Sequence, residues 1–87
     1  MMTIEEIAGI ATRHSSSLRA SYPDRVLIDV RREILSPAST IFVTVRQFDQ
    51  SYSTASLTVS PADSIEMVEH QAAAFFHHFE ESLKLPT

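Results

Sequence analysis

Cysteine and tryptophan are absent from this sequence of 87 residues, and glycine occurs only once. Without cysteine the chain can form no disulfide, no thiolate metal site and no cysteine nucleophile. A single glycine excludes the phosphate-binding loops that need two or more glycines, such as G-x-G-x-x-G or G-x-x-x-x-G-K followed by Ser or Thr. No stretch approaches the roughly 18 consecutive apolar residues of a membrane span. The sequence therefore predicts no association with a membrane.

The composition is that of an ordinary folded domain. Hydrophobic residues make up 44% of the chain and charged residues 21%, which is far from the composition of disordered proteins. The length suits one domain, and we expect residues 1–87 to form it. The first residues show no basic segment followed by an apolar stretch. We therefore expect no secretory signal and a cytoplasmic location, with which the missing cysteines agree.

A first helix is predicted over about residues 3–20. Thr3 and Glu6 have the spacing of a capping box, in which the hydroxyl and the carboxylate each accept a backbone N–H at the helix start. Apolar residues from Ile4 to Leu18 recur at steps of three and four, which places them on one face. The helix is expected to end before Pro23, because the residue preceding a proline avoids helical angles.

Three strands are predicted, over about residues 25–34, 40–48 and 53–60. Apolar and polar residues alternate in each, and β-branched residues dominate. The short connections favour antiparallel hairpins. The alternation gives the sheet one apolar face, made of Val26, Ile28, Val30, Ile41, Val43, Val45, Ala55, Leu57 and Val59.

A second helix is predicted over about residues 61–84. Ser60 is suited to cap it, Pro61 to occupy its first position and Asp63 its third. Apolar residues follow at helical spacing as far as Leu83. Two helices with one apolar stripe each, and a sheet with one apolar face, predict a two-layer α+β domain. Its order is α-β-β-β-α, with a three-stranded antiparallel sheet and both helices on the same face.

Histidine and glutamate pairs on the second helix are the first candidates for chemistry. Glu66 with His70, and His77 with Glu81, lie four residues apart, a spacing that lets two side chains meet on one metal ion. The two histidines are about 10 Å apart along the helix axis, so one ion cannot bind both. Neither pair completes a site, and we predict no metal and no cofactor.

No catalytic residues are predicted either. His14 and Ser15 are adjacent on a helix and therefore do not face each other as a base and a nucleophile would. A half-buried histidine with one hydrogen bond is the favoured interpretation of His14. The protein is accordingly expected not to be an enzyme.

Two surfaces are candidates for binding a partner protein, and the sequence does not choose between them. One is the acidic outer side of the second helix, with Glu66, His70, His77, Glu80 and Glu81. The other is the outer face of the sheet, where apolar side chains lie among arginines: Leu27, Arg31, Phe42, Arg46 and Phe48.

Self-association is predicted at the end of the second helix. A helix over 61–84 would be roughly 36 Å long, whereas a nine-residue strand spans about 30 Å. The overhanging end would carry Phe79 and Leu83. A second copy of the chain would cover them in a homodimer, unless the first helix does so through Leu18.

The element order resembles that of the double-stranded RNA-binding domain over nearly the whole chain, and this resemblance implies duplex binding. That family opens its second helix with a lysine-rich turn, whereas residues 60–64 here contain no basic residue. Residues 61–87 carry five acidic side chains and one lysine, a net charge of −4. Phosphate contacts dominate nucleic-acid affinity, so this acidic region disfavours direct binding.

Small, acidic, cysteine-free α+β chains without a catalytic motif are also similar, as a class, to inhibitors from phages and mobile elements, including anti-CRISPR proteins. That resemblance implies an acidic helix that occupies a basic groove on nucleic-acid-handling machinery. The sequence thus predicts a non-catalytic protein-interaction module, with inhibition of such machinery as its sharpest form. A nucleic-acid-binding domain and a subunit of a larger assembly are the alternatives.

Overall fold

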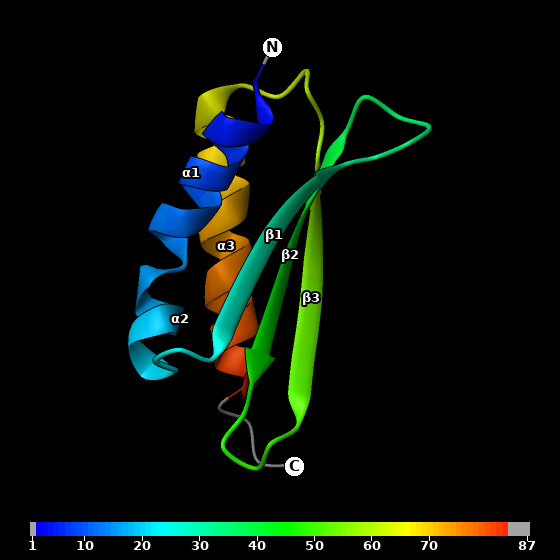
Figure 1. Cartoon of the computed structure of the whole chain (residues 1–87). Coiled ribbons are helices and arrows are strands. Elements are labelled where there is room, and N and C mark those ends of the chain that lie inside the picture. Colours follow the sequence, from blue (N-terminus) through cyan, green and yellow to red (C-terminus); the bar gives the residue numbers. More distant parts are fainter. Residues whose placement is uncertain (1, 84–87) are drawn as a thin grey trace.

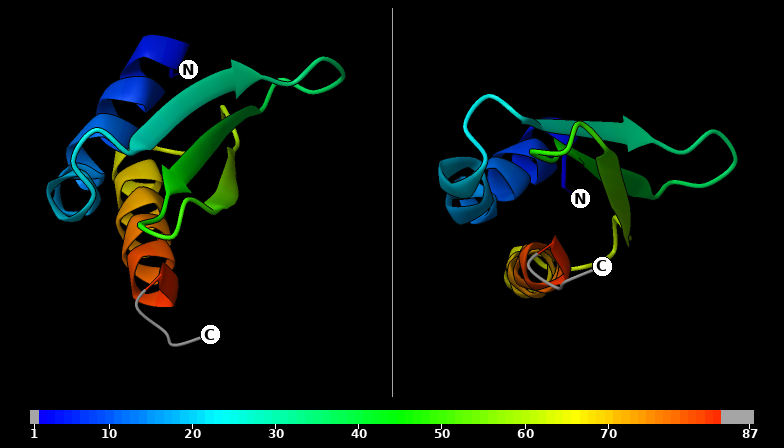
Figure 2. Two further views of the ribbon diagram at one scale, coloured as in Figure 1. Left: turned by 60° about the horizontal axis from the view of Figure 1, so that its bottom comes forward. Right: turned by 90° about the horizontal axis from the view of Figure 1, so that it is seen from below.

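The computed structural model describes residues 2–83, which form two layers (Figure 1). The elements in chain order are α1 (Ile4–His14), α2 (Ser16–Ser21), β1 (Val26–Arg32), β2 (Ser39–Arg46), β3 (Tyr52–Val59) and α3 (Ile65–Leu83). One layer is an antiparallel sheet with the strand order β1-β2-β3. The other layer contains the helices, which lie together on one face of that sheet (Figures 1 and 2). The predicted α+β fold class is therefore confirmed.

The strand register follows from the alternation in the sequence. Val43 of β2 lies opposite Ile28 of β1 and Ala55 of β3, so the inner face holds the even-numbered residues of β1 and the odd-numbered residues of β2 and β3. The apolar residues of β2 on the inner face, Ile41, Val43 and Val45, are fully buried, since β2 is the central strand. A slip of one residue would expose all of them, and this cost fixes the register.

The core lies between the inner face of the sheet and the helices. The helix α1 packs on β1 and β2, α3 packs on β3, and the two helices pack on each other. The buried residues that form this core are Ile7, Ile10, Ala11, Leu18, Ile41, Val43, Val45, Val59, Val68, Ala72, Phe76 and Phe79.

The first helix is not continuous over residues 3–20 as predicted, because the chain leaves helical geometry at Ser15. The capping box at Thr3 is present, but Ser15 ends α1 with φ −95° and ψ 3° before α2 begins. The buried hydroxyl of Ser15 donates to the carbonyl oxygen of Thr12 at 3.0 Å. The guanidinium of Arg19 donates to the same oxygen at 2.7 Å. Serine side chains compete with the helical backbone for such bonds, and this breaks the helix in a run of three serines.

The second predicted helix begins at Ile65 rather than at Pro61. The hydroxyl of Ser64 accepts the backbone N–H of Met67 at 3.1 Å, the bond of an N-cap to its third helical residue. Ser60 instead closes a turn: its carbonyl accepts the N–H of Asp63 at 3.1 Å, and its hydroxyl accepts the N–H of Ala62 at 3.2 Å. This turn carries the chain from the sheet layer to the helix layer. The predicted end at residue 84 lies outside the described residues.

The change of cap predicts different effects for two serine substitutions. Ser64→Ala is expected to lower the free energy of unfolding by about 1 kcal/mol, because it removes the hydroxyl that satisfies an N–H of the first turn of α3. Ser60→Ala removes only a bond within the turn and should change it by less than about 0.5 kcal/mol. Urea unfolding followed by circular dichroism measures both. A larger loss for Ser60→Ala would place the cap where the sequence predicted it.

The strands start and end within one or two residues of the prediction, and the hairpins explain the differences. At the β2–β3 turn, the N–H of Gln47 donates to the carbonyl oxygen of Ser51 at 2.8 Å. Asp49 accepts both the N–H and the hydroxyl of Ser51, at 3.0 and 2.6 Å. Gln50 has φ 72°, a left-handed conformation that glycine usually adopts. The turn therefore occupies residues that the sequence assigned to the end of the second strand.

Candidate functional site

The helices leave the other face of the sheet uncovered (Figure 2). The strand register arranges its side chains in cross-strand rows. We call this surface the outer face; it comprises Leu27, Asp29, Arg31, Thr40, Phe42, Thr44, Arg46, Tyr52, Thr54, Ser56 and Thr58. It therefore contains four of the five side chains that the sequence proposed for a partner surface on the sheet.

Three shallow depressions follow one another along the outer face. The first, of about 350 Å³, lies between Arg46 and Tyr52 and reaches Leu27. The second, of about 260 Å³, lies between Leu27 and Phe42. The third, of about 440 Å³, runs from Phe42 and Arg31 into the β1–β2 loop. The first two depressions share Leu27 and Thr44, and the last two share Arg31 and Phe42, so the three adjoin one another. We call this row of adjoining depressions the trough.

Large apolar side chains are concentrated at this trough. Leu27 is 68% exposed, Phe42 37% and Tyr52 69%. At the end of the trough in the β1–β2 loop, Ile34 is 96% and Leu35 98% exposed. Sequence reasoning missed this last pair, although two adjacent large apolar residues beside a serine and a proline were the available signal. A contiguous exposed apolar surface of this kind is typical of interaction sites.

The arginines of the outer face differ in what they contact. Arg31 is held by Asp29, with its Nε 2.6 Å from the carboxylate Oδ2. Arg46 is exposed, and no ion pair of its side chain is found within residues 2–83. A guanidinium presents its donors in a fixed fork that fits a carboxylate with two parallel bonds. Arg46 is therefore the group on this face best placed to receive an acidic side chain.

Phe48, which the sequence grouped with this face, is placed differently. It lies in the β2–β3 turn and is 66% exposed. Its ring stacks on Tyr22 with the centroids 5.4 Å apart, and the guanidinium of Arg25 lies 4.7 Å from its centroid. Arg25 also donates to the carbonyl oxygen of Gln47 at 2.9 Å. Phe48 thus anchors the hairpin end and lines none of the three depressions.

The acidic side of α3 is a separate surface. Glu66, His70, His77 and Glu81 are exposed, whereas Glu80 is half-buried and accepts the hydroxyl of Ser17 at 3.4 Å. Because α3 lies on the inner side of the sheet, this surface does not adjoin the outer face (Figure 1). A partner with one flat binding surface could contact only one of the two.

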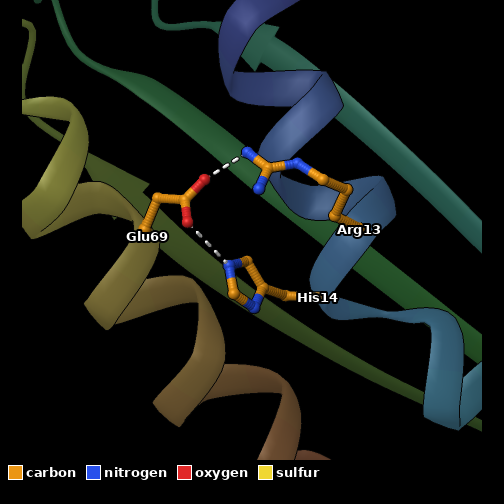
Figure 3. Close-up of polar contacts among 3 residues, drawn as sticks. All are labelled: Arg13, His14 and Glu69. Carbon is orange, nitrogen blue, oxygen red and sulfur yellow. Dashed lines mark hydrogen bonds and ion pairs between the residues drawn. The ribbon is translucent and has the colours of Figure 1, made fainter.

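A polar cluster that no sequence pattern predicted joins α1 to α3 (Figure 3). The guanidinium of Arg13 donates to Glu69, and the other carboxylate oxygen lies 3.5 Å from Nε2 of His14. The hydrogen bond from Arg13 lowers the pKa of Glu69, with the charges of Arg13 and His14 adding to this effect and desolvation opposing it. The carboxylate therefore keeps its charge to lower pH than usual and links the helices; the link is lost as the pH falls through that lowered pKa.

The end of α3 is covered within a single chain. Phe79 is only 6% exposed and belongs to the same buried cluster as Leu18 of α2, and Leu83 is partly buried against that cluster. The hydroxyl bond from Ser17 to Glu80 places α2 beside this part of α3. The core of the same chain thus covers Phe79 almost fully and Leu83 in part, where the sequence expected a second copy to cover them. The homodimer itself stays a prediction.

Neither of two further features is found in the described part of the chain. Within residues 2–83, no three His, Asp or Glu side chains come together in a way that could hold a metal ion. Over the same residues, no helix has the length and apolar character needed to cross a membrane.

Comparisons with known proteins gave no match. No family model matches the chain. No curated protein matches it in sequence. No solved structure matches its fold.

Proposed function

We propose that this protein is a protein-interaction module that binds its partner through the outer face of the sheet. The observation that carries the proposal is the trough, a row of three adjoining depressions between Tyr52 and the β1–β2 loop, with exposed apolar side chains along its length. Of the eight large hydrophobic side chains exposed in residues 2–83, six lie on the outer face or in the hairpin loops at its ends: Leu27, Ile34, Leu35, Phe42, Phe48 and Tyr52.

A protein partner suits this surface better than a nucleic acid. Interface centres are rich in aromatic residues and arginine and poor in lysine, as this face is. Nucleic-acid affinity depends instead on many cations that contact phosphates. Arg31 is already paired with Asp29, which leaves Arg46 as the cation of the strand rows, while Arg25 and Arg32 line the two ends of the trough. These few cations, separated by apolar side chains, support single carboxylate contacts better than a row of phosphates.

The chemistry of the face also describes the partner. The depressions beside Leu27 and Phe42 would accept apolar side chains, and Arg46 would accept a carboxylate close to them. A partner segment with apolar residues next to an acidic one therefore fits the trough. The acidic side of α3 supports the inhibitory mode predicted from the sequence, in which α3 would occupy a basic groove. Binding through the acidic side of α3 is therefore the alternative to binding through the outer face, and the variants described next distinguish the two.

Affinity purification from the native host, followed by mass spectrometry, identifies the partner, and purified variants then test the surface. Leu27→Ser with Phe42→Ser should weaken binding of that partner at least about tenfold, because burying each apolar side chain contributes roughly 1.5–3 kcal/mol. Glu66→Lys with Glu81→Lys should leave the affinity unchanged. Both pairs are on the surface, and circular dichroism checks that the fold is intact.

If Glu66→Lys with Glu81→Lys weakened binding and Leu27→Ser with Phe42→Ser did not, the outer face would not be the binding surface, and the acidic side of α3 would be favoured. Binding of duplex DNA or RNA below about 1 µM at roughly physiological salt, weakened by Arg46→Ala, would instead favour the nucleic-acid alternative. Arg46→Gln in the wild-type background tests the carboxylate contact and should weaken binding of the partner.

A further inference from the structure

The two edges of the sheet are protected to different degrees. Edge strands present unpaired backbone groups, and monomeric proteins usually protect them with charges, prolines or bulges. The edge strand β1 carries Asp29, Arg31 and Arg32. The other edge strand, β3, contains neither a charged residue nor a proline in its eight residues. Within residues 2–83, no strand pairs with β3 on the side away from β2. The β3 edge is therefore open to another strand.

The core is also less well covered beside β3. An opening of about 410 Å³ lies between β3 and α3, lined by Ser53, Ala55, Phe75, His78, Phe79 and Ser82 among others. Ala55 and Leu57 belong to the inner face and are only partly buried, as are Val26, Ile28 and Val30 at the other edge, so it is the opening that distinguishes the β3 side. An additional strand at this edge would cover the exposed sides of Ala55 and Leu57.

We propose that the additional strand is β3 of a second copy of the chain, paired antiparallel about a twofold axis at Ser56. In this register Thr54 lies opposite Thr58 of the partner subunit on the outer face. On the inner face, Ala55 lies opposite Leu57 of the partner subunit. Apolar side chains thus meet apolar ones and hydroxyls meet hydroxyls. Since β3 has no charged side chain, the pairing brings no like charges together.

The hydroxyl groups of the outer face support this register. Thr40 and Thr58 have their Oγ1 atoms 3.4 Å apart, and those of Thr44 and Thr54 are 3.2 Å apart. Pairing about Ser56 would join the two rows into one that runs Thr40, Thr58, the partner's Thr54 and the partner's Thr44. Cross-strand threonine pairs of this kind stabilise sheets. The β1 edge offers no such match, because self-pairing about its centre would place Asp29 opposite its own copy.

The resulting dimer would have one continuous six-stranded sheet with its helices on one side. A closed twofold arrangement uses the same strand in both copies and leaves no open β3 edge. The two outer faces would adjoin on the other side of the sheet. The site of the proposed function therefore stays accessible, and the two proposals can fail independently.

Sedimentation equilibrium on the full chain tests the proposal with two variants that differ by one residue. Thr54→Lys with Thr58→Lys would place like charges opposite each other in both symmetry-related pairs, and the dimer dissociation constant should rise at least about tenfold. Thr54→Lys with Thr58→Glu would place a lysine opposite a glutamate in each pair and should stay dimeric. Both positions are exposed, and circular dichroism confirms folding of each variant.

Three results would overturn the proposal. The first is a wild-type chain that remains monomeric at concentrations up to about 1 mM, which would mean a dimer dissociation constant above about 1 mM. The second is a dimer that tolerates both double variants, since its contact would then lie elsewhere. The third is a loss of the dimer in both variants, which would exclude the register about Ser56. Slow backbone hydrogen exchange of residues 53–59 in the wild-type dimer, and faster exchange in the lysine double variant, is expected as the independent sign of pairing.

Discussion

Phe76→Ala is expected to lower the free energy of unfolding by about 3–5 kcal/mol, the usual cost of removing a buried phenylalanine ring. Phe76 is 2% exposed in the centre of the core cluster. Its ring packs edge-on against that of Phe75, with centroids 5.0 Å apart. A domain of this size is stable by only about 4–13 kcal/mol, so the variant should be partly or largely unfolded at 37 °C.

The neighbouring residues on α3 provide matched controls for this prediction. His77 is exposed, and His77→Ala should change the stability by less than about 0.5 kcal/mol. Phe75 is half-buried, and Phe75→Ala should have an intermediate effect. Thermal and urea unfolding of the three variants gives the ranking. Equal losses for Phe75→Ala and Phe76→Ala would mean that the described packing of α3 on the sheet is wrong.

Leu18→Ala is expected to cost about 2–5 kcal/mol and to release α2 from the core. Leu18 is 1% exposed and is the one buried residue among the six of α2. A helix of six residues is not stable by itself in water, so packing must hold it in place. Backbone hydrogen exchange of residues 16–21 should therefore become fast, together with the loss in overall stability.

Ser16→Ala is the control for Leu18→Ala, because Ser16 is exposed in the same short helix. It should leave both the exchange of α2 and the unfolding midpoint nearly unchanged. Since Leu18 and Phe79 belong to the same buried cluster, loss of α2 would also expose part of that apolar cluster. Leu18→Ala at high concentration is therefore expected to aggregate. Unchanged exchange of α2 in Leu18→Ala would show that other contacts hold this segment.

Most of the fold follows from periodicity, which is a local property of the chain. A strand turns successive side chains to opposite faces, so the alternation of valines and isoleucines in β1 and β2 was enough to predict the inner face. The capping box at Thr3 could likewise be read from four residues, because its bonds join residues three apart. Both features depend on backbone geometry alone.

Where two local solutions compete, the sequence did not decide between them. Ser60 and Ser64 are both suitable caps, and the crossing from the sheet layer to the helix layer places Ser60 in the turn and Ser64 at the cap. The bond of the Ser15 hydroxyl to Thr12 competes with continuation of the helix, and packing of Leu18 on the core favours the break. In each case a contact distant along the chain selects one of two arrangements of similar local energy.

The candidate site divides in the same way. The alternation of β1 and β2 determined by itself that Leu27, Arg31, Phe42 and Arg46 share the outer face. Only the tertiary structure decided that they border one trough, that Phe48 packs on Tyr22 and Arg25 outside it, and that Arg13 joins Glu69. The physical reason is the separation along the chain of the residues that interact. A periodic pattern fixes the direction of each side chain relative to its own backbone, whereas the twist of the sheet and the packing of residues far apart in the chain fix which side chains meet.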